Sequence, residues 1–213
     1  MTTAVWRKTT PMEQEPSTPS GLARELGGAR AAARCDAERL SQALSAAASG
    51  VVSYLAGAEV PIALSMTQSG ALVHTDPNTV RQATKAVSGR LAALLAGEAL
   101  HVLQKGKAGA GPSHAAMRLQ ATWLAVGEAQ GRFDCIDTNV KPNTTAMERA
   151  FSREKTLRST VARRLDGAQK QATAILKRNL AAVDLIAGHL MTDGVVASET
   201  LVDLLAMSEE RKW

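Results

Sequence analysis

One stretch decides the fold of this chain: Leu44-Ser45-Ala46-Ala47-Ala48-Ser49-Gly50-Val51-Val52-Ser53-Tyr54-Leu55-Ala56-Gly57. Apolar residues recur there at spacings of three and four, which places them on one side of an α-helix. They are Leu40, Leu44, Ala47, Val51 and Leu55. Asp36 is a good N-cap residue and Gly57 a good stop. The pattern therefore predicts a helix from about Asp36 to Leu55.

Composition favours helices around this segment. The chain has 213 residues, which suits one medium-sized domain with a tail. Apolar residues make up 45% of it, but aromatic residues only 3%. The core must then consist mainly of Ala, Leu and Val, which suits closely packed helices. The net charge of +5 permits contacts with nucleic acid or an acidic surface but does not require them.

The chain divides into a tail and one domain. Residues 1–28 are rich in Pro, Ser, Thr and Gly, so we expect a disordered N-terminal tail. Residues 29–213 form the domain. Within it, Val60–Met66 and Ala71–Thr75 are β-like and flank a turn, which predicts a small sheet of two to three strands.

Three further helical segments are expected after this sheet. They cover Thr79–Leu103, Ser113–Gly127 and Ala146–Met191, the last with a phase shift of its apolar stripe near Asn179. The run Thr192-Asp193-Gly194 should stop it, and Ser198 should cap a final helix. The expected fold class is mainly α with a small β element.

Several segments resemble the peptidase domain of the FtsH-type ATP-dependent zinc metalloprotease family. The opening stretch is similar to the family's zinc helix, His-Glu-Ala-Gly-His-Ala-Val-Val-x-Tyr-Leu-x-Gly. The run from Leu91 to Ala99 is similar to its "LAGRAAE" helix, and Val161–Leu205 to its C-terminal pair of helices. The resemblance spans about residues 36–206 and implies an FtsH-peptidase-like helical domain.

The residues that the family uses for catalysis are absent from the first helix. With Val51-Val52 aligned, the two zinc histidines fall on Ser45 and Ser49, and the general-base glutamate falls on Ala46. Serine and alanine are not zinc ligands, and alanine cannot accept a proton. The resemblance therefore implies a scaffold without catalytic residues.

The third zinc ligand of the family is also missing. Its aspartate position falls on Ser113 or on Met117, depending on the alignment, and no Asp occurs between Asp76 and Asp134. We therefore expect neither a metal nor another cofactor. The leading hypothesis is a pseudopeptidase that acts as a protein-interaction or oligomerisation module.

A relocated zinc site is the first alternative. The histidines are His74, His101, His114 and His189, and no two of them stand four residues apart. His101 and His114 flank a glycine-rich loop and could approach each other. This alternative would make the chain a zinc metallopeptidase after all.

A basic segment supplies the second alternative. The segment from Glu148 to Arg178 contains nine basic residues and three acidic residues. The basic residues are Arg149, Arg153, Lys155, Arg158, Arg163, Arg164, Lys170, Lys177 and Arg178. They could be a solvated helix face, a surface for an acidic protein partner, or the contact of a small nucleic-acid-associated regulatory protein. Phe151 is the one aromatic residue among them, which argues against sequence-specific reading of bases.

The remaining expectations concern location and partners. Cys35 and Cys135 have no metal-type spacing, which is typical of reduced cysteines in a cytoplasmic protein. We find no secretory signal, no run of about 20 apolar residues and no GxxxxGK[ST] phosphate loop. The expected partner is a protein: either further copies of this chain or an active AAA+ protease relative. Nucleic acid and membrane are not expected.

Overall fold

The computed structural model describes residues 19–58, 61–67, 70–75, 83–105, 112–131 and 144–210. The chain divides into two compact units, residues 1–38 and residues 39–213. The described part of the first unit, residues 19–38, is entirely helical. The second unit holds everything else and is the subject of the following paragraphs.

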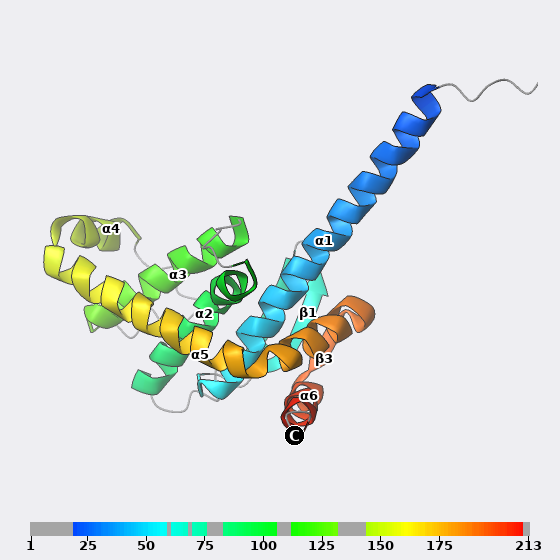
Figure 1. Ribbon diagram of the computed structural model, residues 1–213. Helices are drawn as coiled ribbons and strands as arrows, with labels where there is room; N and C mark the ends of the chain where they lie inside the picture. The colour runs from blue at the N-terminus through cyan, green and yellow to red at the C-terminus, as the bar shows by residue number, and fades with distance from the viewer. Residues whose placement is uncertain are drawn as a thin grey trace, which may run out of the picture. The chain divides into compact units, whose positions relative to one another are not determined.

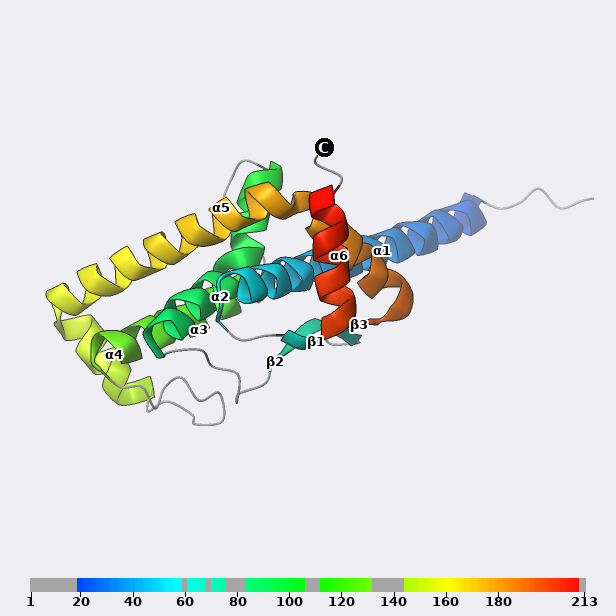
Figure 2. The same ribbon diagram turned by 90° about the horizontal axis from the view of Figure 1, so that it is seen from below.

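The domain is mainly helical, as the composition predicts. Its helices are α1 (Pro19–Leu55), α2 (Ala83–Lys105), α3 (Pro112–Ala129), α4 (Thr144–Arg153), α5 (Lys155–Asp193) and α6 (Ser198–Glu210). Within the second unit, α4 lies at one end, and the sheet and α6 lie at the other (Figures 1 and 2). None of the described helices is long and apolar enough to cross a membrane.

A small antiparallel sheet packs against the helices. Strand β1 (Pro61–Thr67) is central, with β2 (Gly70–Thr75) on one side and β3 (Val195–Ala197) on the other. Leu64 pairs with Val73 of β2 and with Val196 of β3, and it is fully buried. The two expected strands are confirmed. The position of the third strand was not predicted. It has only three residues, and an alternation of apolar and polar side chains cannot be recognised over so short a stretch.

Helix α5 organises the core because it contacts α2, α3, α4, α6 and two strands. Its buried side chains are Leu157, Val161, Ala168, Ala172, Leu176, Asn179, Ala182, Val183, Ile186, Ala187 and Leu190. The predicted phase shift is confirmed, since Asn179 has non-helical backbone angles (φ −126°, ψ 23°). Its side-chain amide donates to the carbonyl of Ile175 at 2.8 Å. The kink lets both halves of α5 turn an apolar side inward.

Glycine ends α5 as the sequence predicts. Gly194 adopts the left-handed conformation (φ 75°), and its N–H bonds to the Leu190 carbonyl at 3.1 Å. Its own carbonyl accepts from the backbone N–H of Met66 at 2.7 Å. Gly194 therefore both ends α5 and bonds to β1. Glycine suits this position because a residue without a Cβ adopts the left-handed conformation readily.

Two expected boundaries differ from the structure. The helix expected over Ala146–Met191 is broken at Glu154, whose extended backbone (φ −97°, ψ 106°) separates α4 from α5. The break is stabilised by Arg158, whose guanidinium donates to the carbonyls of Phe151 and Ser152 at the end of α4. Helix α1 begins at Pro19, earlier than Asp36, so residues 19–28 of the expected tail are helical. Residues 1–18 and Thr79–Gln82 lie outside the described residues.

The pairing of Leu64 leads to a stability prediction. Leu64→Ala removes a fully buried side chain between two strands and α1, so it should lower the free energy of unfolding by about 2–4 kcal/mol. Ile62→Ala is the control, because Ile62 is 52% exposed on the same strand, and this change should alter the free energy of unfolding by under about 1 kcal/mol. Urea titration followed by circular dichroism measures both. Equal losses for the two variants would contradict the assigned register.

Candidate functional site

Ser45, Ala46 and Ser49 lie on α1, inside the domain. Ala46 is buried at 5% exposure, whereas Ser45 and Ser49 are half-buried. Their neighbours Ala47 and Ala48 are fully buried. This part of α1 is therefore a packing surface made of small side chains, which lets other helices approach closely.

Three helices meet at Ser45. A Cβ added to Gly97 of α2 would collide with Ser45 Oγ and lie 3.3 Å from His114 Nε2 of α3. Ser45 Oγ itself is 3.5 Å from His114 Nε2, a long contact for a hydrogen bond. We call Ser45, Gly97, His101 and His114 the serine–histidine cluster. Glycine is needed at position 97 because the hydroxyl of Ser45 occupies the space of its side chain.

The two histidines around the glycine-rich loop do approach each other. The rings of His101 and His114 pack edge to face with their centres 5.8 Å apart. In the described ranges, however, no group of three or more His, Cys, Asp or Glu side chains is placed to hold a metal ion. His74 is elsewhere, bonded to Ser65 Oγ at 2.8 Å, and His189 contacts Asp193 at 3.1 Å.

The serine–histidine cluster contains a serine and a histidine, but the described residues place no third group there that would orient the histidine. A serine nucleophile needs a base that is itself oriented by another group. His114 Nδ1 is buried and has no hydrogen-bond partner among the described residues, so nothing there fixes its tautomer. The arrangement therefore suits packing between helices better than acyl transfer.

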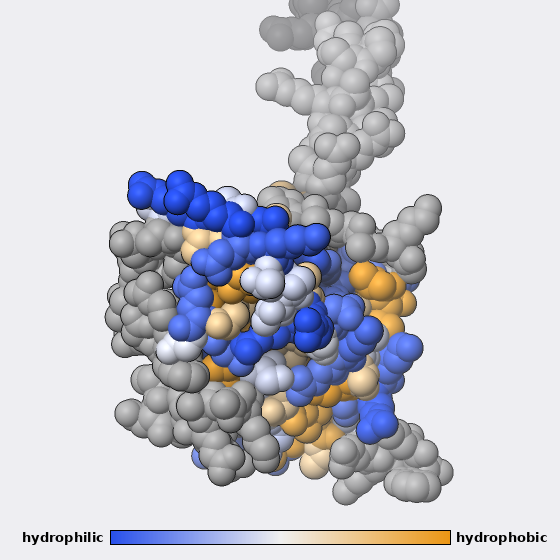
Figure 3. Space-filling model, turned by 90° about the vertical axis from the view of Figure 1, so that its left-hand side faces the viewer, coloured by the Kyte–Doolittle hydropathy of each residue, from blue (hydrophilic) through white to orange (hydrophobic). Residues whose placement is uncertain are grey.

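The basic segment divides between two helices. Arg149 and Arg153 lie on α4, and the other seven residues on α5; all nine are exposed except Arg164, which is half-buried. Figure 3 shows the face formed by this end of the domain, where hydrophilic residues surround smaller hydrophobic areas. The break at Glu154 means that the nine residues do not share one continuous helix face.

Three of the basic side chains bind within the chain. Arg158 caps α4, Arg164 pairs with Glu128 of α3, and Lys170 pairs with Asp166 at 2.8 Å. The hydrogen bond and the negative charge of Asp166 raise the pKa of Lys170 above its ordinary value. These contacts favour the interpretation of the segment as a solvated face with a structural role at α4.

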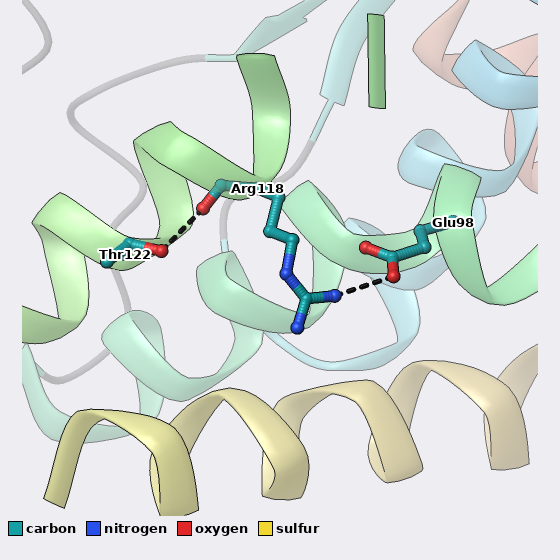
Figure 4. Close-up of polar contacts among 3 residues, drawn as sticks. All are labelled: Glu98, Arg118 and Thr122. Atoms are coloured by element: carbon teal, nitrogen blue, oxygen red, sulfur yellow. Dashed lines mark hydrogen bonds and ion pairs between the residues drawn. The ribbon is translucent and has the colours of Figure 1, made fainter. Parts of the chain in front are cut away.

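A further polar contact was not anticipated from the sequence. Arg118 of α3 reaches across to Glu98 of α2, and its Nη1 lies 2.6 Å from Glu98 Oε1 (Figure 4). Thr122 Oγ1 donates to the carbonyl of Arg118 at 2.8 Å, one turn further along α3. No local sequence pattern links the two residues, because they lie 20 positions apart on different helices.

Comparison with known proteins gives no assignment for this arrangement. No protein-family model matches the sequence, and no curated protein matches it. The function must therefore be argued from the residues themselves.

The collision at Gly97 yields a prediction. Gly97→Ala should lower the free energy of unfolding by about 1–2 kcal/mol, because Ser45 Oγ must rotate away from His114 to make room. In a Ser45→Ala background, the same change should be neutral or stabilise by up to about 1 kcal/mol, as alanine is the better helix former. A double-mutant cycle by chemical denaturation measures the difference. Additive effects would rule out the proposed contact.

Proposed function

We propose that this chain is a non-catalytic, FtsH-peptidase-like protein that works by binding other proteins. The observation that carries the proposal is the packing at Ser45: the position resembling a zinc ligand holds a hydroxyl that fills the space beside Gly97 and His114. This close packing of three helices supports the proposal, because it leaves a hydroxyl where the resemblance implies a metal ligand.

The burial of Ala46 supports the same conclusion. A general base must have its carboxylate free to reach a metal-bound water. Ala46 is 5% exposed and belongs to the alanine-rich core cluster with Ala43 and Ala47. A glutamate at this position would bury an unpaired charge, which is costly. The core is therefore packed for the residue that is present.

A candidate contact surface lies on the sheet, on the face opposite Leu64. Ser65 of β1 pairs with Leu72 on one side and with Val195 on the other, so the three side chains form a row across the sheet. Leu72 is 50% and Val195 55% exposed. This row carries no charge, and exposed apolar patches of this kind mark protein contacts. We assign it to self-association, in keeping with the oligomer expected from the resemblance.

The nucleic-acid alternative has less support. Arg158, Arg164 and Lys170 are engaged within the chain, and the basic segment is interrupted at Glu154. A relocated zinc site would need a third ligand beside His101 and His114, which the described residues do not place there. Neither alternative is favoured by a specific contact.

Metal analysis tests the loss of catalysis. The purified full chain, dialysed against zinc and then against buffer, should retain far less than one zinc per chain by mass spectrometry of its metal content. It should leave an unfolded substrate such as casein intact, with or without added zinc, because Ser45 and Ser49 cannot ligate the metal. Stoichiometric zinc, or cleavage that a chelator stops, would refute the proposal.

Mass measurement tests the contact surface. Light scattering should show an oligomer of the full chain, and Leu72→Glu with Val195→Glu should shift it toward the monomer, because the charges would be buried in the interface. Met207→Glu is the matched control, since Met207 is 47% exposed on α6 and outside the sheet. A monomer at all concentrations, or an equal shift for the control, would remove the sheet from the proposal.

A further inference from the structure

A pocket of about 410 Å³ lies among four helices, apart from the serine–histidine cluster. Its lining comes from α2, α3, α4 and α5 and includes Leu95, Arg118, Phe151, Arg158, Ala162 and Gln169. Sites for small ligands have this size and are mainly apolar with a few polar groups. The pocket has both properties, and no sequence pattern pointed to it.

Its apolar part can hold one side chain. Leu95 and Val161 are each 1% exposed and provide a rigid floor, while Phe151 and Leu165 are half-buried at the sides. Phe151 is held by Trp123, whose ring lies edge to face with it at 6.5 Å between centres. A branched aliphatic or aromatic side chain would gain the burial that these residues offer.

Its basic groups have donors to spare. Arg118 uses one nitrogen, Nη1, for Glu98, and its side chain is 55% exposed. Arg158 uses Nη1 for the carbonyls at the end of α4. A guanidinium has five N–H donors, so both arginines can offer further hydrogen bonds to an anion. Because Glu98 and the α4 carbonyls hold these groups in place, a carboxylate would bind to donors that are already ordered.

One acceptor in the pocket is unsatisfied. Gln169 Oε1 is buried and has no hydrogen-bond partner among the described residues. A buried acceptor without a donor is costly, and a ligand N–H would relieve that cost. Asp166, which pairs with Lys170, adds a second acceptor on the same helix and disfavours a ligand that is anionic throughout.

We propose that this pocket binds the carboxyl terminus of a peptide whose last side chain is apolar. Such an end combines an apolar group, a carboxylate and a neighbouring amide N–H within one residue, which are the three groups that Leu95, the two arginines and Gln169 complement. The inference does not depend on the proposed function, because it uses none of the residues of the serine–histidine cluster or the sheet row.

Four probes separate the parts of this ligand. The peptide acetyl-Ala-Ala-Leu is titrated into the full chain by calorimetry, beside its C-terminal amide, the same peptide ending in Asp, and octanoate. The free acid should bind at least about tenfold more tightly than the amide, because the amide has no negative charge to pair with the guanidinium groups. The Asp peptide should bind at least about tenfold more weakly, because the apolar floor gains nothing. Octanoate has no N–H to donate to Gln169 Oε1, so it should also bind more weakly than the free-acid peptide.

Matched variants locate the binding. Ala162 lines the pocket but is exposed, so Ala162→Leu should abolish binding without disturbing the core. Ala174→Leu, an exposed change further along α5, should leave the affinity unchanged. Gln169→Leu should weaken the peptide but not octanoate, since only the peptide uses the amide oxygen. Thermal melting confirms that each variant is folded. Trp123 fluorescence, with Trp6 and Trp213 changed to Phe, reports occupancy beside Phe151.

The outcomes are distinct. The proposal is supported if the free-acid peptide binds more tightly than the amide and if this binding is lost in Ala162→Leu and kept in Ala174→Leu. Octanoate binding as tightly as the peptide would overturn it in favour of a free amphipathic carboxylate. No binding of any probe, or binding unaffected by Ala162→Leu, would also overturn it. None of these results bears on zinc content or oligomer mass, so this inference and the proposed function fail separately.

Discussion

Close approach between helices is the constraint on which the structure depends. With only 3% aromatic residues, the core cannot be filled by a few large side chains, so backbones must come together. They do so at glycines. A Cβ on Gly50 would lie 2.9 Å from a methyl carbon of Leu64, and one on Gly89 would lie 2.9 Å from that of Ala58. The contact of Gly97 with Ser45 belongs to the same system. The small residues between Ser45 and Ser49 of α1 are thus part of how the whole domain is packed.

The same packing accounts for the composition of α1 between Ser45 and Ser49. Empty space and unsatisfied polar groups inside a domain both destabilise a protein. Small side chains fill this part of α1, with Ala46, Ala47 and Ala48 all buried. A polar contact there joins the Ser45 hydroxyl to the His114 imidazole.

Local patterns in the sequence predicted what local physics controls. The hairpin, the kink at Asn179 and the stop at Gly194 follow from periodicity or from the conformational freedom of one residue. The stripe expected on α1 is only partly confirmed: Ala47 and Val51 are buried, but Leu40 is 45% and Leu55 43% exposed. The break at Glu154 escaped prediction because it depends on Arg158 bonding back to the carbonyls of α4. The position of strand β3 and the pocket among four helices were not predicted for a related reason. Each is formed by residues that are distant in the sequence, so no short stretch of the chain contains all of them.

The pairing of β1 with β3 sets an order of events during synthesis. Strand β1 ends at Thr67, whereas β3 begins at Val195. A ribosome that adds about 5–20 residues per second leaves β1 without its second neighbour for on the order of ten seconds. Contacts between such distant segments also form slowly after release. During that interval the edge of β1 that later pairs with β3 has no partner strand.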